Sequence, residues 1–330
     1  SLTVGGEFWL QNAALTVTGG ELTLAGDASI DRGEVHISGG TVSFEHGLWL
    51  GEGDIVITVT KDSTPIVDPS KETVITIEGV SAEEVEGGRI HTAPNGVDYT
   101  IRLIKDAAFI DLMHASSRAN DECLRRLIPT LRAGDTEKQV CRRYADFAEE
   151  LGALGPSFDP LVCFGANCAE PHHGSDNTPL QANQTVILDL GLNLDGAMSD
   201  MTRTVVLGKA TDEMKRVYDL VKKANEAGRR AVRPGVPMCE IDRAARRVIE
   251  EGGYGPYFIH RTGHGIGLEV HEIPDVSATN QTVAQPGMIF SIEPGIYLPG
   301  RFGVRIEDML YVIEDGCIDL TDAPKSLLIL

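Results

Sequence analysis

The sequence lacks several features that mark particular classes of protein. No apolar run reaches the roughly 18 residues of a membrane-spanning helix, and no basic stretch followed by an apolar run opens the chain, so we expect neither a membrane protein nor a secretory signal. Positive charge is in deficit, because 29 Lys and Arg stand against 49 Asp and Glu, a formal net charge of −20. Nucleic acids and anionic membranes bind basic surfaces, so we expect neither as a partner.

Cysteine is also sparse. The chain has six cysteines and none of them falls in the first hundred residues. Their spacing matches neither a zinc ribbon nor a disulfide framework. We therefore interpret them as free thiols of a protein from a reducing compartment, and we predict a cytoplasmic location.

The sequence does have enough apolar material for a substantial core, at 42% hydrophobic residues. Its length of 330 residues suggests about two domains at roughly 150 residues each. The composition changes near Asn95 and Gly96. We therefore predict a small all-β domain over residues 1–96 and a second domain over residues 97–330.

Residues 1–96 contain a repeat with a period of twenty residues, in which the pattern around Gly19-Gly20 recurs around Gly39-Gly40. Each copy predicts a β-hairpin with a Gly-Gly turn, so that Val17 faces Leu22 and both side chains lie on one face. A small sandwich or roll is the expected fold, and a short solenoid would give the same repeat. We expect a structural cap, with a sugar-binding or oligomerisation module as the alternatives.

Residues 97–330 alternate helical and strand patterns. Helical periodicity runs from about Tyr99 to Ile128, and further helices are predicted over residues 136–151, 211–233 and 237–252. Two pairs of strands lie between and after them, 185–190 with 198–207 and 288–293 with 303–313. The order of helices and strand pairs predicts an α+β domain built from two similar, pseudo-symmetric halves.

The first strand pair brings two carboxylates together. If Asp195-Gly196 forms the turn, Asp189 lies opposite Thr202, and Asp200 shares the face of Thr202. The two aspartates are then diagonal neighbours beside an apolar strand. Such an arrangement is costly unless a cation pairs the charges.

The second strand pair supplies two further carboxylates, Glu293 and Glu307, with Arg305 on the same face as Glu307. Before this pair, the window 260–272 reads His-Arg-Thr-Gly-His-Gly-Ile-Gly-Leu-Glu-Val-His-Glu and places histidines among glycines. Four carboxylates and the imidazole of His264 suit two hard or borderline divalent cations, such as Mn²⁺. Two such ions can share a hydroxide and assist hydrolysis.

The window 260–272 resembles, position by position, the signature of the proline peptidases, aminopeptidase P and prolidase, which are pita-bread metallopeptidases. The runs Ser-Asp-Met-Thr-Arg-Thr from Ser199, Glu-Pro-Gly-Ile-Tyr from Glu293 and Phe-Gly-Ala-Asn-Cys-Ala-Glu-Pro-His from Phe164 are similar to the same family. The resemblance covers about residue 97 to residue 330 and implies the pita-bread fold for that domain.

The resemblance also implies a role for each matched residue. Two divalent ions, Mn²⁺ with Co²⁺ or Zn²⁺ as alternatives, are implied, with the ligand set Asp189, Asp200, His264, Glu293 and Glu307. It implies that a metal-bridged hydroxide attacks the peptide, that Glu293 moves the proton, and that His172 and His271 donate hydrogen bonds to the carbonyl oxygen. His260 and Tyr297 are implied to line the pocket and Arg305 to orient Asp189. The implied substrates are peptides with proline in the second position.

The first segment departs from the family, whose members mostly carry an N-terminal α/β domain that helps form a dimer and covers the pocket. For this chain the choice between dipeptidase and aminopeptidase, and the homodimer, therefore stay open. A methionine aminopeptidase-like enzyme and a non-catalytic pita-bread module that binds peptides or proteins are alternative functions. Cleavage of a small carbon–nitrogen bond, as in creatinase, is a third.

Overall fold

The computed structural model describes residues 104–105 and 107–330 and, within residues 1–102, the strands alone. Contacts divide the chain into two units, residues 1–104 and residues 105–330. The boundary between residues 96 and 97 stays a prediction.

The elements described in the first unit are thirteen strands, most of which form parallel sheets. Strands β1, β4, β7 and β10 form one sheet, β3, β6, β9 and β11 a second, and β2, β5 and β8 a third, while β12 and β13 pair antiparallel. Their bounds are β1 (Leu2–Val4), β2 (Phe8–Gln11), β3 (Ala14–Val17), β4 (Glu21–Leu24), β5 (Ala28–Asp31), β6 (Glu34–Ile37), β7 (Gly40–Phe44), β8 (Leu48–Leu50), β9 (Val56–Thr60), β10 (Ser63–Pro65), β11 (Val74–Glu78), β12 (Gly88–Thr92) and β13 (Asp98–Arg102).

This pairing corrects the predicted hairpins. Val17 and Leu22 were expected to face each other, but β3 and β4 belong to different sheets. Each residue instead pairs with its equivalent one repeat later, as in Leu22 with Val42. A twenty-residue period lets equivalent positions stack in parallel, which is the register of the solenoid alternative rather than of a sandwich of hairpins. The predicted turns, including Gly19-Gly20, lie outside the described residues.

The second unit contains four long helices, α1 (Ala107–Leu127), α2 (Glu137–Glu150), α3 (Asp212–Ala231) and α4 (Met238–Glu251). Three of the predicted helices are confirmed, and Thr136 forms a capping box with Gln139 at the start of α2. The predicted helix start at Tyr99 is wrong, because Tyr99 lies in β13, where alternation of apolar residues outweighs the helical period. Among the described residues, no helix combines the length and apolar character needed to cross a membrane.

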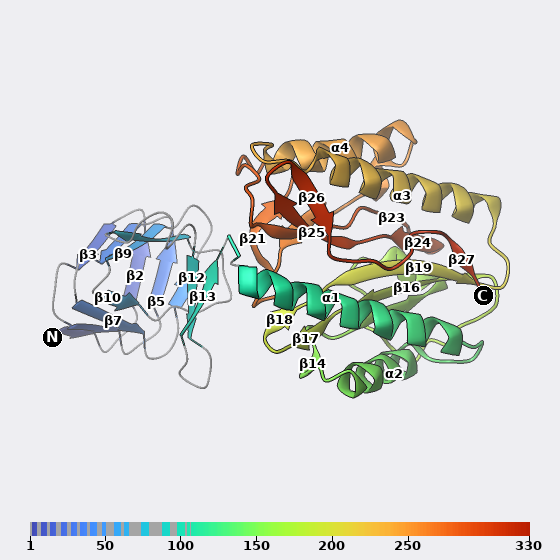
Figure 1. Cartoon of the computed structure of the whole chain (residues 1–330), viewed down its shortest axis with the longest axis horizontal. Helices are drawn as coiled ribbons and strands as arrows, with labels where there is room; N and C mark the ends of the chain where they lie inside the picture. Colours follow the sequence, from blue (N-terminus) through green and yellow to red (C-terminus); the bar gives the residue numbers. More distant parts are fainter. Residues whose placement is uncertain are drawn as a thin grey trace. The chain divides into compact units, whose positions relative to one another are not determined.

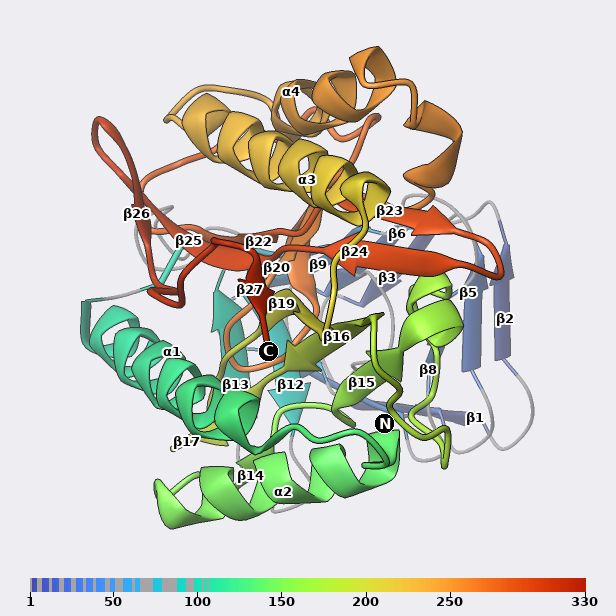
Figure 2. The same cartoon turned by 90° about the vertical axis from the view of Figure 1, so that its right-hand side faces the viewer.

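The two larger sheets of this unit lie between the pair α1 and α2 and the pair α3 and α4 (Figures 1 and 2). One sheet has the order β15-β16-β19-β27 and another the order β21-β20-β22-β25-β26, with small sheets β14-β17-β18 and β23-β24 beside them. Their bounds are β14 (Gly155–Pro156), β15 (Leu161–Phe164), β16 (Gln184–Leu190), β17 (Leu192–Leu194), β18 (Ala197–Met198), β19 (Met201–Leu207), β20 (Gly263–Gly265), β21 (Glu272–Val276), β22 (Ile289–Ile292), β23 (Gly295–Leu298), β24 (Phe302–Arg305), β25 (Asp308–Ile313), β26 (Gly316–Asp319) and β27 (Leu328–Ile329). Short 3-10 helices, η1 (Ile128–Thr130), η2 (Gly165–Ala169) and η3 (Gly255–Tyr257), complete the unit.

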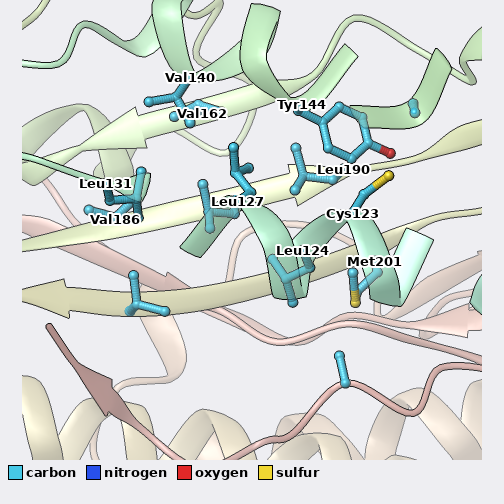
Figure 3. Close-up of a cluster of buried hydrophobic side chains, with 14 of the residues drawn as sticks. Cys123, Leu124, Leu127, Leu131, Val140, Tyr144, Val162, Val186, Leu190 and Met201 are labelled. Atoms are coloured by element: carbon cyan, nitrogen blue, oxygen red, sulfur yellow. The ribbon is translucent and has the colours of Figure 1, made fainter. Parts of the chain in front are cut away.

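A core of apolar side chains packs β16 against α1 and α2 (Figure 3). Apolar side chains from α1, α2, β15, β16 and β19 bury one another there, with Tyr144 fully enclosed. The Tyr144 hydroxyl donates to Oδ1 of Asn120 over 2.8 Å, and Nδ2 of Asn120 donates to the carbonyl of Leu190 over 2.7 Å. A buried phenol needs such a partner, and this chain of hydrogen bonds holds the end of β16 beside Asp189 in place.

Candidate active site

The first strand pair has the register that the sequence predicted. Asp189 of β16 lies opposite Thr202 of β19 in the register of the two strands. The turn that sets this register has positive φ at both central residues, 51° at Asp195 and 94° at Gly196, as a tight hairpin turn requires. Asp189 and Asp200 are both buried.

The imidazole of the second half comes from β20, whose backbone runs unusually close to β22. A Cβ atom on Gly263 would lie 1.9 Å from the carbonyl oxygen of Ser291, so the position admits only glycine. The approach lets the His264 amide donate to Oγ of Ser291 over 3.1 Å. His264 is thereby held with its side chain buried.

The remaining carboxylates flank strands of the same half, Glu293 directly after β22 and Glu307 directly before β25. The Thr202 hydroxyl donates to Oε2 of Glu307 over 2.7 Å, and the Glu307 amide donates to the Thr202 carbonyl over 3.1 Å. Thr202 of β19 therefore contacts the carboxylate of Glu307 directly.

All five predicted ligand residues line one cavity of about 680 Å³, together with His172, His260, His271 and Arg305. Apolar side chains complete the wall, among them Phe158, Leu161, Pro171 and Val270. Tyr297 was also predicted to line the pocket, but it is buried behind the wall and touches His260 and Arg305 instead.

Three of the ligand side chains fit a shared cation. One ligand atom from each of Asp200, His264 and Glu307 lies within 4.8 Å of the other two. Nε2 of His264 is 3.6 Å from Oδ2 of Asp200 and 3.5 Å from Oε1 of Glu293. Among the buried side chains that the structure describes, Oδ1 of Asp200 and Oε1 of Glu307 have no hydrogen-bond partner. Buried carboxylate oxygens without donors are costly, and a metal ion would satisfy them.

The electrostatics of the carboxyl cluster also favour a bound cation. Burial raises the pKa of Asp200 well above its ordinary value, and the nearby charges of Glu307, Asp189 and Glu293 raise it further. Burial likewise raises the pKa of Glu307, with Glu293 and Asp189 adding to the effect. Burial, opposed by Arg305 and reinforced by Asp189, raises the pKa of Glu293 to about 7. Carboxyl groups in this state need a cation before all of them can ionise.

Two of the histidines are neutral by virtue of their surroundings. Burial and then the charge of His271 lower the pKa of His264 to about 3, which leaves a ring nitrogen for a metal. Burial and then Arg305 lower the pKa of His260 to about 3. The ring of His271 stands edge-on to that of His264, with the centroids 4.3 Å apart.

Arg305 connects the metal-ligand cluster to the cavity wall. Its Nη2 donates to Oδ2 of Asp189 over 2.5 Å, and its Nε donates to the Thr202 hydroxyl over 3.1 Å. Its Nη1 donates to the Tyr297 hydroxyl over 3.0 Å and to the Pro171 carbonyl over 3.1 Å. Such a planar, permanently charged fork fixes the direction of Asp189.

Sequence reasoning missed several residues that shape the site. It placed Thr202 opposite Asp189 but did not assign it the contact with Glu307. It also overlooked the buried ion pair of Lys105 and Glu272, whose charged atoms are 2.5 Å apart, and the fully buried Glu137. Only the position of Glu272 directly after His271 gave a local signal; the partners lie too far apart in the chain.

The chain is similar in sequence to a known family of peptidases. The sequence pattern of metallopeptidase family M24 matches residues 111–314. An uncharacterized peptidase of Staphylococcus aureus (strain MSSA476) is 40% identical over 232 residues, which cover 69% of this chain and 66% of that protein. The chain thus spans slightly less than two thirds of that relative's length.

Solved structures agree. The X-Pro aminopeptidase from Thermotoga maritima MSB8 is 34% identical, with a TM-score of 0.69 over 70% of this chain and 65% of that chain. The recombinant prolidase from Thermococcus sibiricus is 34% identical, with a TM-score of 0.71 over 83% of this chain and 73% of that chain. The Xaa-Pro dipeptidase from Bacillus anthracis is 29% identical, with a TM-score of 0.70 over 86% of this chain and 81% of that chain. The mixed α and β architecture of the chain is that of these proteins.

Proposed function

Because the chain belongs to metallopeptidase family M24, we propose that it is an exopeptidase that removes the residue before a proline from the N-terminus of peptides. The observation that carries the proposal is the group of Asp200, His264 and Glu307, with two buried oxygens that lack donors, on the wall of a cavity that holds further histidines. We assign two divalent cations, Mn²⁺ in the first place, to Asp189, Asp200, His264, Glu293 and Glu307.

When bound, such a pair of ions supplies a nucleophile at neutral pH by acidifying water and polarises the scissile carbonyl. The chain's own groups then have distinct tasks. Glu293, a carboxylate on the cavity wall, takes up a proton and returns it to the departing nitrogen, as general base and then acid.

The cavity histidines act on the carbonyl oxygen. His172 and His271 are exposed on the cavity wall, and each offers a ring N–H to the negative charge that develops there. Desolvation beside the wall lowers the pKa of His271, with Arg261 adding to the effect. The neutral ring still carries one N–H group, so the role does not depend on its charge.

The apolar part of the wall supports the preference for proline. An Xaa-Pro bond is a tertiary amide whose nitrogen carries no hydrogen, so the site has to select proline by shape. Phe158, Leu161, Pro171 and Val270 provide such a surface beside the histidines. Similarity to an X-Pro aminopeptidase and to prolidases also supports a preference for proline.

The test is hydrolysis of Ala-Pro and Ala-Pro-Ala by metal-stripped protein, with and without Mn²⁺, beside Met-Ala as a competitor and Asp200→Asn as a control. Metal-dependent cleavage of the dipeptide alone would identify a dipeptidase, and release of alanine from the tripeptide an aminopeptidase. Preferred cleavage of Met-Ala would replace the proline assignment with a methionine aminopeptidase. No cleavage and no bound metal would overturn the enzyme and leave the binding module.

A further inference from the structure

Glu137, in the first turn of α2, is fully buried and uses both carboxylate oxygens. Oε1 accepts from the amide of Phe164 over 2.8 Å and from Nδ2 of Asn167 over 2.9 Å. Oε2 accepts from the amide of Asp176 over 2.9 Å and from Nε2 of His173 over 3.1 Å. All four donors belong to one segment, residues 164–176. The carboxylate is therefore saturated by hydrogen bonds, and the grouping of Glu137, His173 and Asp176 needs no metal ion.

The segment 164–176 carries His172 to the cavity wall. Its Pro171 lines the same cavity, and the Pro171 carbonyl accepts from Nη1 of Arg305 over 3.1 Å. The segment is thus held from two sides, by Glu137 from α2 and by Arg305 from β24. A short segment held at both sides has few ways to change the direction of the side chain between its anchors.

The adjacent residues His172 and His173 lie in different environments. The side chain of His173 is only 14% exposed and points its Nε2 at Glu137, whereas His172 is exposed on the cavity wall. A hydrogen bond from a neutral or charged imidazole to a carboxylate is among the stronger contacts of a protein. Because the two residues are adjacent, fixing the ring of His173 restricts the backbone that aims His172.

We propose that Glu137 is a positioning residue, which acts on peptide hydrolysis through His172 by holding segment 164–176 in place. The proposal rests on the function proposed above, because it takes His172 to contact the carbonyl oxygen of the substrate. Glu137 itself lines no part of the cavity. A misplacement of about 1 Å can cost on the order of 100-fold in rate, so a remote carboxylate can matter this much.

The test is a kinetic double-mutant cycle of Glu137→Gln and His172→Ala, with Ala-Pro-Ala or Ala-Pro, whichever the wild type cleaves. In Glu137→Gln the amide N–H₂ can no longer accept from Asp176, so we expect kcat to fall about 10- to 100-fold with KM little changed. In the His172→Ala background the same change should cost less than about 2-fold, because its effect runs through a side chain that is gone. Equal losses in both backgrounds, or an unchanged kcat, would overturn the proposal.

Two further variants are a matched control for the Glu-to-Gln change and a smaller change to the same hydrogen bonds. Glu149→Gln makes the same chemical change at an exposed position of the same helix and should keep the wild-type kcat. His173→Ala removes one of the four donors and should lower kcat in the same direction by a smaller factor, which keeps the test available if Glu137→Gln folds poorly. An unaltered kcat in a folded His173→Ala protein would count against the proposal.

A second readout does not depend on activity. The amides of Phe164 and Asp176 donate to Glu137, so their hydrogen exchange should be faster in Glu137→Gln while the exchange of β16 stays as in the wild type. Unchanged exchange at both amides would overturn the proposal even if the enzyme proved active on other peptides. Failure of the wild type to cleave any Xaa-Pro peptide would instead overturn the proposed function.

Discussion

Nη2 of Arg305 lies 2.5 Å from Oδ2 of Asp189, and this contact joins β24 to β16 across the two halves of the second unit. The same guanidinium holds Thr202, Tyr297 and the Pro171 carbonyl. One side chain thus sets the direction of a metal-ligand residue and of the wall that carries the histidines.

Replacing Arg305 with lysine should lower metal affinity and kcat/KM by about 10- to 100-fold, as loss of a partner of a metal ligand usually does. Lysine keeps the charge but cannot present the planar fork that reaches Asp189 and Thr202 together. Titration of the metal-free protein with Mn²⁺ and peptide hydrolysis measure the two effects. Arg301→Lys, at an exposed arginine paired with Glu213, should change neither.

Thr202→Val should destabilise the metal-free protein by about 1–3 kcal/mol, because Glu307 loses its donor and Nε of Arg305 loses its acceptor. Urea denaturation measures the free energy of unfolding. Thr185→Val on the neighbouring strand is the control, since the Thr185 hydroxyl is buried without a partner and its removal should be neutral or stabilising. Equal costs for the two variants would contradict the assigned role of Thr202.

Lys105→Met should cost about 3–5 kcal/mol of stability, because it leaves Glu272 as an unpaired buried charge. Glu272 also accepts from the amides of Leu268 and Glu269, so the loop before His271 should loosen and kcat should fall with it. Lys223→Met removes an exposed partner of Asp219 and should stay within about 0.5 kcal/mol of the wild type. A Lys105→Met protein as stable as this control would show that the ion pair contributes nothing.

The carboxyl cluster should lower the stability of the metal-free protein as pH rises from about 4.5, the ordinary pKa of a glutamic acid, through about 7, whereas His260 and His264, whose pKa values burial lowers to about 3, should raise it over the same range. Burial raises the pKa of Glu293, and burial and neighbouring carboxylates raise those of Asp200 and Glu307. In this window the folded chain holds carboxyl protons that the unfolded chain has released, so these groups make the free energy of unfolding fall with pH. Thermal unfolding at pH 5, 6, 7 and 8 in a chelator measures the trend.

Added Mn²⁺ should reverse that trend, because its binding requires the same carboxylates to release their protons and therefore tightens as pH rises. The control is Asp200→Asn, in which both the loss on raising the pH and the recovery with metal should be smaller. Equal changes in stability of the wild type and Asp200→Asn between pH 5 and pH 8 without metal would contradict the assigned carboxylate cluster.

Much of the catalytic unit is readable from the sequence because its signals are local. Thr136 caps α2 three residues before Gln139, and Asp195-Gly196 sets the register that places Asp189 opposite Thr202. Such patterns act within a few residues, so a single sequence contains them.

Other features depend on partners that are remote in the chain. Lys105 and Glu272 are 167 positions apart, and Glu137 meets donors 27 to 39 positions away. The hairpins predicted for residues 1–96 are wrong for a related reason. Its period fits antiparallel pairing within one copy and parallel pairing between copies equally well, and only the register of Leu22 with Val42 distinguishes them.

The contact between Thr202 and Glu307 limits how the second unit can open. The two residues come from different halves, as do Asp189 and Arg305. A hinge motion that parted the halves would break both contacts at once and pull the carboxylates away from one another. We therefore expect the two halves to stay closed while a substrate enters and leaves the cavity.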